Sequence, residues 1–326
     1  MQNLRIKRIG CFLMAFFLLA SGCKESDPNI PEKSGTLYYS SANELIKYDF
    51  RSKQEVSLFS GGDNYRISED AKRFLWYKNN FTDGITQVQV HNLQTPSEYQ
   101  TITVPLVIEH TPQFVIGETS LFAALARAED EPINRTDLVF FNDNNQINGR
   151  IPHVKSFVFL PNGNDIILSA EALNAQGEPI GYALALLKNY QSETDQQSIV
   201  IHEYPDYAQL PEGIAVSPNG RQIVFTQSDH LYTANTQENG TPKQLTQSRF
   251  REIDAAWSPD GQSIIFTANV SGVAECGEIR IIPAHPNDPI PVPEDGVNNK
   301  PVDPLQPLDS DGEVIHACAS ESFIWL

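Results

Sequence analysis

Three histidines have the clearest potential for chemistry in this 326-residue sequence. They are His110, His153 and His316, and each comes shortly before a segment that we expect to form a β-strand. Neutral imidazole is a common ligand of transition metals, so three rings around one rim could hold an ion. The spacing from histidine to strand differs among the three. We therefore favour loop histidines with ordinary hydrogen bonds, keep a metal site as the alternative, and predict no cofactor.

Motifs for other kinds of catalysis do not occur in the sequence. It has no Gly-x-Ser-x-Gly nucleophile elbow, no His-Glu-x-x-His zinc motif and no glycine-rich phosphate loop. The acidic segment 309–313 has some of the composition of a calcium loop, but it lacks the glutamate at position 12. We interpret that segment as an ordinary acidic turn, and we predict no catalytic residue.

The elements that must position these residues are set by an internal repeat. The segment 215–226 (AVSPNGRQIVFT) returns as 256–267 (AWSPDGQSIIFT), with the two serines 41 positions apart. Pro and Gly specify a tight turn, and the flanking β-branched and aromatic residues favour strands. Repeats of about 40–45 residues built from short strands are typical of β-propellers. Two unrelated hairpins with similar turns are the alternative, but the match extends through both strands.

Weaker copies of the repeat occur earlier in the chain. Residues 159–169 keep the Pro-Asn-Gly turn, 67–77 keep the serine and the apolar triplet, and 113–124 keep only Gly117. The copies resemble the TolB-type, WD40-like propeller repeat of bacterial envelope proteins. The resemblance covers residues 36–326. It implies a propeller fold, but it implies a particular activity only weakly because propellers have many functions.

The two ends of the repeat region predict how the ring closes. The first ordered segment, 37–40, resembles a second blade strand, and no turn motif precedes it. The last segment, 322–326, resembles an innermost strand with no strand after it. We therefore expect the C-terminal strand to complete the first blade, which removes an exposed sheet edge. The prediction is an all-β, six-bladed propeller; seven blades is the alternative.

Approximate blade boundaries follow from these copies. Blade 6 is expected over 253–293, with an irregular proline-rich loop over 283–307. The other expected blades are 36–60 with 320–326, 64–104, 112–150, 154–203 and 213–246.

Two cysteines are expected to staple the closing strand. Cys276 falls between the second and third strands of blade 6, and Cys318 falls just before the closing strand of blade 1. Such loops lie on one face of a propeller, and blades 6 and 1 are neighbours. An even pair of cysteines in an exported protein favours a disulfide. Two free buried thiols are the alternative.

The N-terminus predicts export and lipid anchoring. Residues 1–22 combine a basic start with a short apolar run, as in a signal peptide. The sequence Leu-Ala-Ser-Gly before Cys23 resembles a bacterial lipoprotein signal, which implies cleavage there and lipidation of Cys23; an ordinary signal peptide is the alternative. Residues 23–35 are then the lipidated cysteine and a polar tether, and 36–326 are the propeller domain. Lys24 favours the outer membrane by the sorting tendency of that family.

Charge restricts the possible partners. The net charge is −18, and removal of the signal peptide makes it −21. Such an acidic chain is unsuited to nucleic acid, and acyl chains rather than charge would hold it at a membrane. We interpret the acidic residues as a solvated surface, with a basic partner as the alternative.

Two functions remain open from the sequence. The first is a non-catalytic module that binds an envelope protein or cell-wall component; the best-known member of the TolB type binds a peptidoglycan-associated lipoprotein, although its N-terminal domain is absent here. The second is a carbohydrate-binding or metal-assisted, polysaccharide lyase-like propeller, since some propellers that resemble this one are lyases with histidine-held metals. The binding residues are not predicted.

Overall fold

The computed structural model describes most of residues 33–326, which form one unit. Outside the described residues lie 1–32 and several short segments, as well as the side chains of 318, 321 and 322. The short segments are 62–64, 81–82, 111, 117–121, 133–134, 143, 145, 175, 177, 193, 270–276, 294–300, 309–310, 315–317 and 320.

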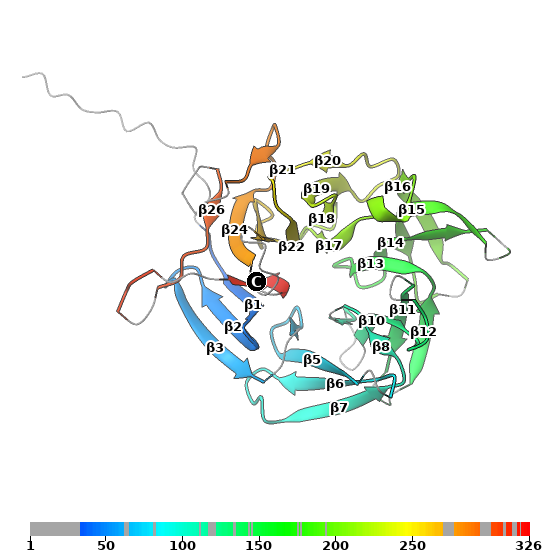
Figure 1. Cartoon of the computed structure of the whole chain (residues 1–326), viewed down its shortest axis with the longest axis horizontal. Helices are drawn as coiled ribbons and strands as arrows, with labels where there is room; N and C mark the ends of the chain where they lie inside the picture. The colour runs from blue at the N-terminus through cyan, green and yellow to red at the C-terminus, as the bar shows by residue number, and fades with distance from the viewer. Residues whose placement is uncertain are drawn as a thin grey trace, which may run out of the picture. The chain divides into compact units, whose positions relative to one another are not determined.

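Six antiparallel sheets surround a central axis as the blades of a β-propeller (Figure 1). In the described part of the chain the only helical segment is the short 3-10 helix η1 (Tyr207–Gln209). Blade 1 consists of β28 (Glu321–Trp325), β1 (Thr36–Ser41), β2 (Glu44–Asp49) and β3 (Gln54–Ser60). The prediction of an all-β, six-bladed propeller closed by its C-terminal strand is confirmed.

Blades 2 to 4 follow in chain order. Blade 2 contains β4 (Arg66–Ile67), β5 (Arg73–Asn80), β6 (Ile85–Asn92) and β7 (Tyr99–Val104). Blade 3 contains β8 (Val107–Ile108), β9 (Gln113–Phe114), β10 (Phe122–Arg127), β11 (Asp137–Phe141) and β12 (Ile147–Ile151). Blade 4 contains β13 (Val154–Phe159), β14 (Ile166–Leu173), β15 (Pro179–Lys188) and β16 (Gln197–Tyr204).

Blades 5 and 6 contain the two best copies of the repeat. Blade 5 consists of β17 (Glu212–Val216), β18 (Gln222–Gln227), β19 (His230–Asn235) and β20 (Lys243–Gln244). Blade 6 consists of β22 (Glu252–Trp257), β23 (Ser263–Ala268), β24 (Gly277–Pro283), β26 (Asp303–Pro304) and β27 (Cys318–Ala319). A parallel pair, β21 (Thr246–Gln247) and β25 (Ile290–Pro291), connects the two blades.

The turns after the innermost strands of blades 5 and 6 explain the repeat. The Ser258 hydroxyl donates to Asp260 and accepts from the amide of Ser263, and Ser217 makes the same contacts with Asn219 and Gln222. The glycines of these turns have φ near +70°, a conformation that glycine adopts without strain. In blade 2, Ala71 takes this position with φ +51°. The turn geometry therefore persists where the sequence motif has lost its glycine.

Two blade boundaries differ from the sequence prediction. The innermost strand of blade 3 begins at Val107, because β8 and β9 both pair with β10 on either side of an interruption. In blade 6 the outer partners of β24 are two short strands: β26, from the region expected to be an irregular loop, and β27, from just before the closing strand. Proline lacks a backbone donor, so this region supplies only short paired pieces.

Blade 1 closes by pairing β28 with β1. Leu37 lies opposite Trp325, and Thr36 exchanges two backbone hydrogen bonds with Leu326, at 2.7 and 2.9 Å. Gly35 precedes this contact; a Cβ there would lie 2.2 Å from the Leu326 carbonyl oxygen. The chain ends are thus held edge to edge, with no room for a side chain at residue 35.

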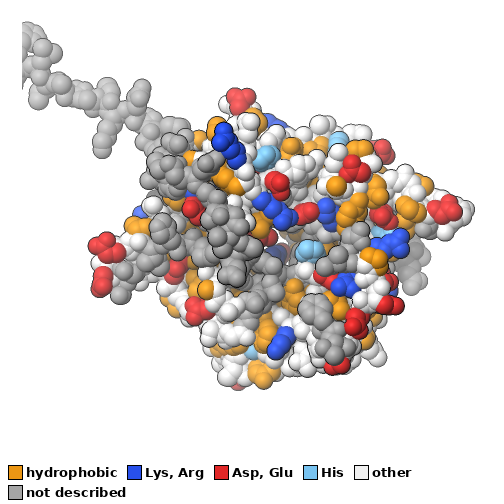
Figure 2. All heavy atoms as spheres, viewed as in Figure 1, with side chains coloured by type: hydrophobic (Ala, Val, Ile, Leu, Met, Phe, Trp, Pro, Cys, Tyr) orange, Lys and Arg blue, Asp and Glu red, His pale blue; other side chains and the backbone are white. Residues whose placement is uncertain are grey.

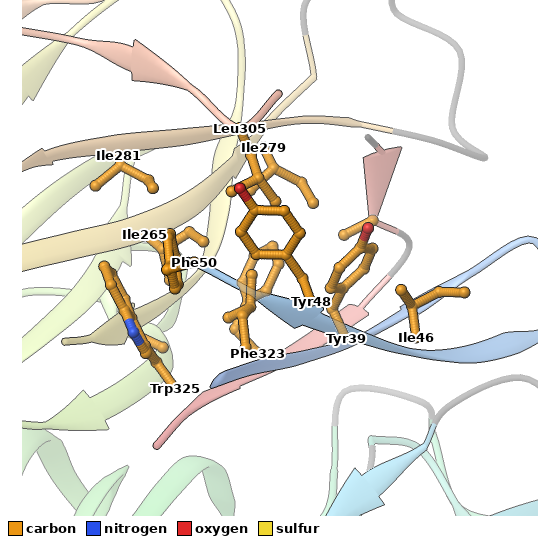
Figure 3. Packing of buried hydrophobic residues seen from close by; sticks show 13 residues of the cluster. Tyr39, Ile46, Tyr48, Phe50, Ile265, Ile279, Ile281, Leu305, Phe323 and Trp325 are labelled. Carbon is orange, nitrogen blue, oxygen red and sulfur yellow. The ribbon is translucent and has the colours of Figure 1, made fainter. Parts of the chain in front are cut away.

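Aromatic packing reinforces the closing strand (Figure 3). The Trp325 ring stacks on Phe50 with centroids 4.5 Å apart, and its indole nitrogen donates to the Ser34 carbonyl at 2.9 Å. Tyr39 and Phe323 lie alongside, and Ile279 and Ile281 of blade 6 complete the cluster from the neighbouring sheet. The cluster joins the first and last blades of the chain.

The predicted disulfide falls largely outside the described residues, since Cys276 and the side chain of Cys318 are not described. The backbone of Cys318 pairs with Glu278 of β24. The disulfide stays a prediction.

No helix among the described residues is long and apolar enough to cross a membrane.

Replacing Trp325 with alanine should lower the free energy of unfolding by about 3–5 kcal/mol, because a buried aromatic ring and its hydrogen bond are lost together. The side chain is only 6% exposed. Urea denaturation of the purified protein measures the change. The matched control is Ile180→Ala, whose side chain is 68% exposed and should change the stability by less than about 0.5 kcal/mol. Equal effects at both positions would contradict the role of the closing strand.

Candidate functional site

The axis of the propeller contains a cavity of about 850 Å³. Its wall is built from the innermost strands of the blades, so its lining mixes backbone, apolar side chains and a small set of charged ones. Figure 2 shows Lys or Arg, Asp or Glu, and His side chains gathered around the central opening. The charged and histidine side chains that line the cavity are Arg66, Glu69, His110, Lys155, Glu212, Arg251 and Asp254.

These side chains separate into two groups, defined by which charged side chains act on one another. Lys155 and Glu212 lie near the beginning of their innermost strands, whereas Pro161, Pro218 and Pro259 follow the ends of such strands and line the cavity elsewhere. We call the channel end where the innermost strands begin the N-terminal mouth. His110, Lys155, Glu212 and Arg251 form the mouth cluster.

Glu212 is the centre of the mouth cluster. One carboxylate oxygen lies 2.9 Å from Lys155 Nζ, and the other accepts a hydrogen bond from Arg251 at 2.8 Å. Arg251 also lies 3.7 Å from Asp229. The three innermost or preceding segments that carry these groups come from blades 4, 5 and 6, so the ion pairs join neighbouring blades at the mouth.

Lys155 is fixed by further contacts. Its ammonium lies 3.5 Å from the Tyr207 carbonyl, 3.4 Å from the Leu210 carbonyl and 4.9 Å from the centre of the Tyr207 ring. The helix η1 places Tyr207 there, and Asp206 caps that helix through the Gln209 amide. The side chain of Lys155 is 13% exposed. Lys155 is therefore held by a carboxylate, two carbonyls and an aromatic face, and its charge stabilises the local structure.

The protonation states of the mouth cluster are linked. Burial alone would raise the pKa of Glu212, but the hydrogen bond and charge of Lys155, with the charge of Arg251, outweigh burial and lower that pKa. Desolvation within the cavity lowers the pKa of His110, although its ring is open to the cavity. The nearby Glu212 raises the His110 pKa and Lys155 lowers it. His110 is therefore a neutral ring near pH 7 that can donate at one nitrogen and accept at the other.

A second group lies around Arg66, and we call Arg66, Glu69 and Asp254 the arginine centre. Arg66 begins β4 of blade 2, whereas Asp254 lies within β22 of blade 6. Desolvation lowers the pKa of Arg66, and the charges of Glu69 and Asp254 oppose that shift. Desolvation also raises the pKa of Glu69, against the effect of Arg66. The arginine centre thus holds one cation and two acids in a partly desolvated wall.

A β-bulge aims Asp254. The pairing of β22 with β23 shifts between Ile253 and Ala256, and Asp254 has φ +55°. Gly213 occupies the same position of the repeat in blade 5, with φ +57° and the same kind of bulge. A left-handed conformation is strained for aspartate and costs about 1–3 kcal/mol. Blade 6 therefore carries a carboxylate where blade 5 uses the unstrained residue.

Side chains of neighbouring blades satisfy polar groups along the innermost strands. Gln113 donates to the Phe157 carbonyl at 3.0 Å, and Trp257 donates to the Ala215 carbonyl at 3.3 Å. The Ser156 hydroxyl accepts from the Ile214 amide at 3.3 Å. A free strand edge can pair with another strand. Because neighbouring blades already satisfy these backbone groups, a ligand in the cavity would be recognised by side chains.

The histidines proposed from sequence do not share one environment. His110 lines the cavity, in the interruption between β8 and β9. His153 does not line it; its ring is hydrogen-bonded to Glu171, and its amide donates to Asp137 at 2.9 Å. His316 lies outside the described residues. Among the residues that the structure describes, no group of three His, Cys, Asp or Glu side chains is placed to hold a metal.

Comparison with known proteins supports the fold. No protein-family model matches the sequence, and no curated protein matches it. TolB from Acinetobacter baumannii is similar in structure, with TM-score 0.56 and 13% identity, covering 78% of this chain and 62% of that chain. A putative TolB from Agrobacterium tumefaciens has TM-score 0.52 and 12% identity, covering 85% and 90%.

A structure with a different name is similar to a comparable degree. A putative 6-phosphogluconolactonase from Bacteroides uniformis has TM-score 0.52 and 13% identity, covering 88% of this chain and 90% of that chain. These structural similarities support a TolB-like propeller fold. Sequence identities this low leave the activity open.

The charged lining was missed by sequence reasoning. Motif searches select recurring patterns, whereas Arg66, Lys155 and Arg251 occupy dissimilar positions of degenerate repeats. One signal was present: Asp254 stands 41 residues after Gly213, so the repeat aligns a strained aspartate with a glycine.

Opposite shifts in the pKa of His110 should follow from two substitutions in the mouth cluster. Lys155→Met removes a positive charge and should raise the His110 pKa, whereas Glu212→Gln removes a negative charge and should lower it. Titration of the imidazole ¹⁵N signals by NMR measures both shifts. His91, which does not line the cavity, is the internal control, and its pKa should be the same in both variants as in the unmodified protein. Shifts of the same sign in both variants would show that the cluster does not act through charge.

Proposed function

We propose that this protein is a non-catalytic binding module of the bacterial cell envelope and that its central cavity receives the ligand. The observation that carries the proposal is the cavity itself: about 850 Å³, with a wall of apolar side chains and a few placed charges. Ligand sites in proteins typically have volumes of about 300–1,000 Å³ and this mixture of surfaces. The ligand is an envelope protein or a cell-wall component.

The mouth cluster suits recognition. Lys155 and Arg251 contact the Glu212 carboxylate at 2.9 and 2.8 Å, which fixes their positions before a ligand arrives. Preorganised polar groups reduce the ordering cost of binding. His110 adds a neutral donor and acceptor beside them.

Envelope placement rests on the N-terminal sequence and on the TolB resemblance. We propose that residues 1–22 direct export, that Cys23 carries the lipid, and that residues 23–35 tether the propeller to the outer membrane on its periplasmic side. The net charge of the mature chain, −21, would oppose direct contact of the propeller with anionic lipid.

A carbohydrate-binding or carbohydrate-processing propeller is the second candidate. The arginine centre favours it, since charged planar side chains beside apolar walls suit polar small ligands. The structural similarity to a putative 6-phosphogluconolactonase agrees with a polar ligand of small size. A metal-assisted lyase would need further ligands beside His110.

Photocrosslinking inside the cavity tests the binding role. Benzoylphenylalanine in place of Phe114, which lines the cavity, should capture the ligand when intact cells are irradiated. The same probe in place of Val56, 55% exposed on β3, should not form that adduct. Mass spectrometry of the adduct separates a protein from a glycan. Absence of any adduct at 114, or equal capture at both positions, would count against the cavity as the binding site.

Anchoring has its own test. Cys23→Ala should abolish incorporation of an alkyne-labelled fatty acid and release the protein from the membrane fraction, because the thiol is the only proposed attachment point. Cys318→Ala is the matched control and should retain the label. Labelling that survives Cys23→Ala would disprove lipidation at this residue.

A further inference from the structure

The arginine centre differs from the mouth cluster in how its cation is used. Lys155 and Arg251 each form an ion pair with Glu212. Arg66 forms no hydrogen bond and no ion pair within 4.0 Å through its side chain with any residue that the structure describes, although it lines the cavity and is half-buried. Its five N–H donors are therefore available on the cavity wall. A half-buried guanidinium with no acceptor among the described residues can bind a ligand that supplies oxygen atoms.

The acids beside Arg66 restrict the kind of ligand. Glu69 and Asp254 line the same cavity and are close enough to act on Arg66 electrostatically. Their carboxylates would repel an anionic ligand, and Arg66 would repel a cationic one. Arg66 can only donate hydrogen bonds and ionised carboxylates can only accept them. A hydroxyl group does both, so adjacent hydroxyls match a guanidinium flanked by carboxylates.

The wall next to the arginine centre provides an apolar surface. Strand β9, which carries Phe114, packs beside β4, which carries Arg66, and Phe114 lines the cavity. One face of the Phe114 ring is covered by Arg73, whose guanidinium carbon lies 4.7 Å from the ring centre. This contact fixes the ring. Apolar C–H faces of a sugar ring pack on such a surface while its hydroxyls reach polar groups.

We propose that the arginine centre binds adjacent hydroxyl groups of an uncharged sugar. Arg66 donates to the hydroxyl oxygens, and Glu69 and Asp254 accept from the same hydroxyls. Gly213 occupies the corresponding bulge in blade 5, so the bulge itself does not need aspartate. The inference rests on the proposed function, since it names the chemistry of the ligand that the cavity receives.

Three matched sugars test the charge requirement. Glucose, glucuronate and glucosamine share one ring and differ in being neutral, anionic and cationic; galactose, galacturonate and galactosamine form a second series. Binding to the purified full-length protein is measured by saturation-transfer NMR and by the shift of the Arg66 Nε–H signal. We expect the neutral sugar of at least one series to bind and to exceed both charged members at least several-fold. Stronger binding of a uronate or an amino sugar, or no binding by either neutral sugar, would overturn the proposal.

Substitutions separate loss of the site from loss of the fold. Asp254→Gly should abolish sugar binding while the protein stays folded, because Gly213 occupies the same bulge in blade 5. Arg66→Lys keeps the charge but loses the planar fork, and should weaken binding about tenfold or more. Arg51→Lys, in the exposed turn between β2 and β3, is the control and should bind as the unmodified protein does. Unchanged binding in Asp254→Gly and Arg66→Lys would place the sugar elsewhere.

Two outcomes distinguish the sugar assignment from the binding role in the cell envelope. If the probe at position 114 captures a protein in cells and no neutral sugar binds, the cavity is a binding site and the sugar assignment is wrong. If the neutral sugar binds through Arg66 but the probe captures nothing in cells, the chemistry of the centre holds and the envelope role fails.

Discussion

Pairing of the last strand with the first is the interaction on which the rest of the structure depends. Residues nearly three hundred positions apart, Leu37 and Trp325, lie opposite each other in one sheet. Without β28, blade 1 would present the open edge of β1 to the axis, and the cluster of Phe50, Trp325 and Ile281 would lose its centre. A closed ring buries the inter-blade faces on both sides of every blade. Closure therefore creates both the core and the cavity.

The innermost strands determine the shape and the polarity of the cavity. Each is short, and those of blades 5 and 6 bulge near the N-terminal mouth. Neighbouring blades cap their polar groups, as Gln113 does for Phe157, so the wall presents side chains. Two kinds of charge result: a mouth cluster whose members hold one another, and an arginine centre whose cation remains available. The mouth cluster is suited to shaping the opening, and the arginine centre is suited to binding a ligand.

Much of the fold could be predicted because the determinants are local. The Ser-Pro-Asp-Gly turn specifies its own geometry through Ser258 and Gly261, and the apolar triplets specify buried strands. Apparent loss of the motif in blade 2 did not change the turn, since Ala71 adopts the left-handed conformation. Blade 6 was predicted less well: its outer pairing uses β26 and β27, whose partners are distant in sequence. Long-range pairing of short segments leaves almost no periodic signal.

The residues of the candidate site could be predicted only in part from the sequence. His110, His153 and His316 each precede a predicted strand, but His110 lines the cavity while His153 bonds to Glu171 outside its lining. Arg66 and Asp254 gave no shared motif, because they come from blades 2 and 6 and meet only around the axis. The sequence alone determined the repeat, the turns and the closed six-bladed ring, since these follow from spacing and residue type. Only the tertiary structure decided which charges face one another, because that depends on the direction of side chains from strands that ring closure brings together.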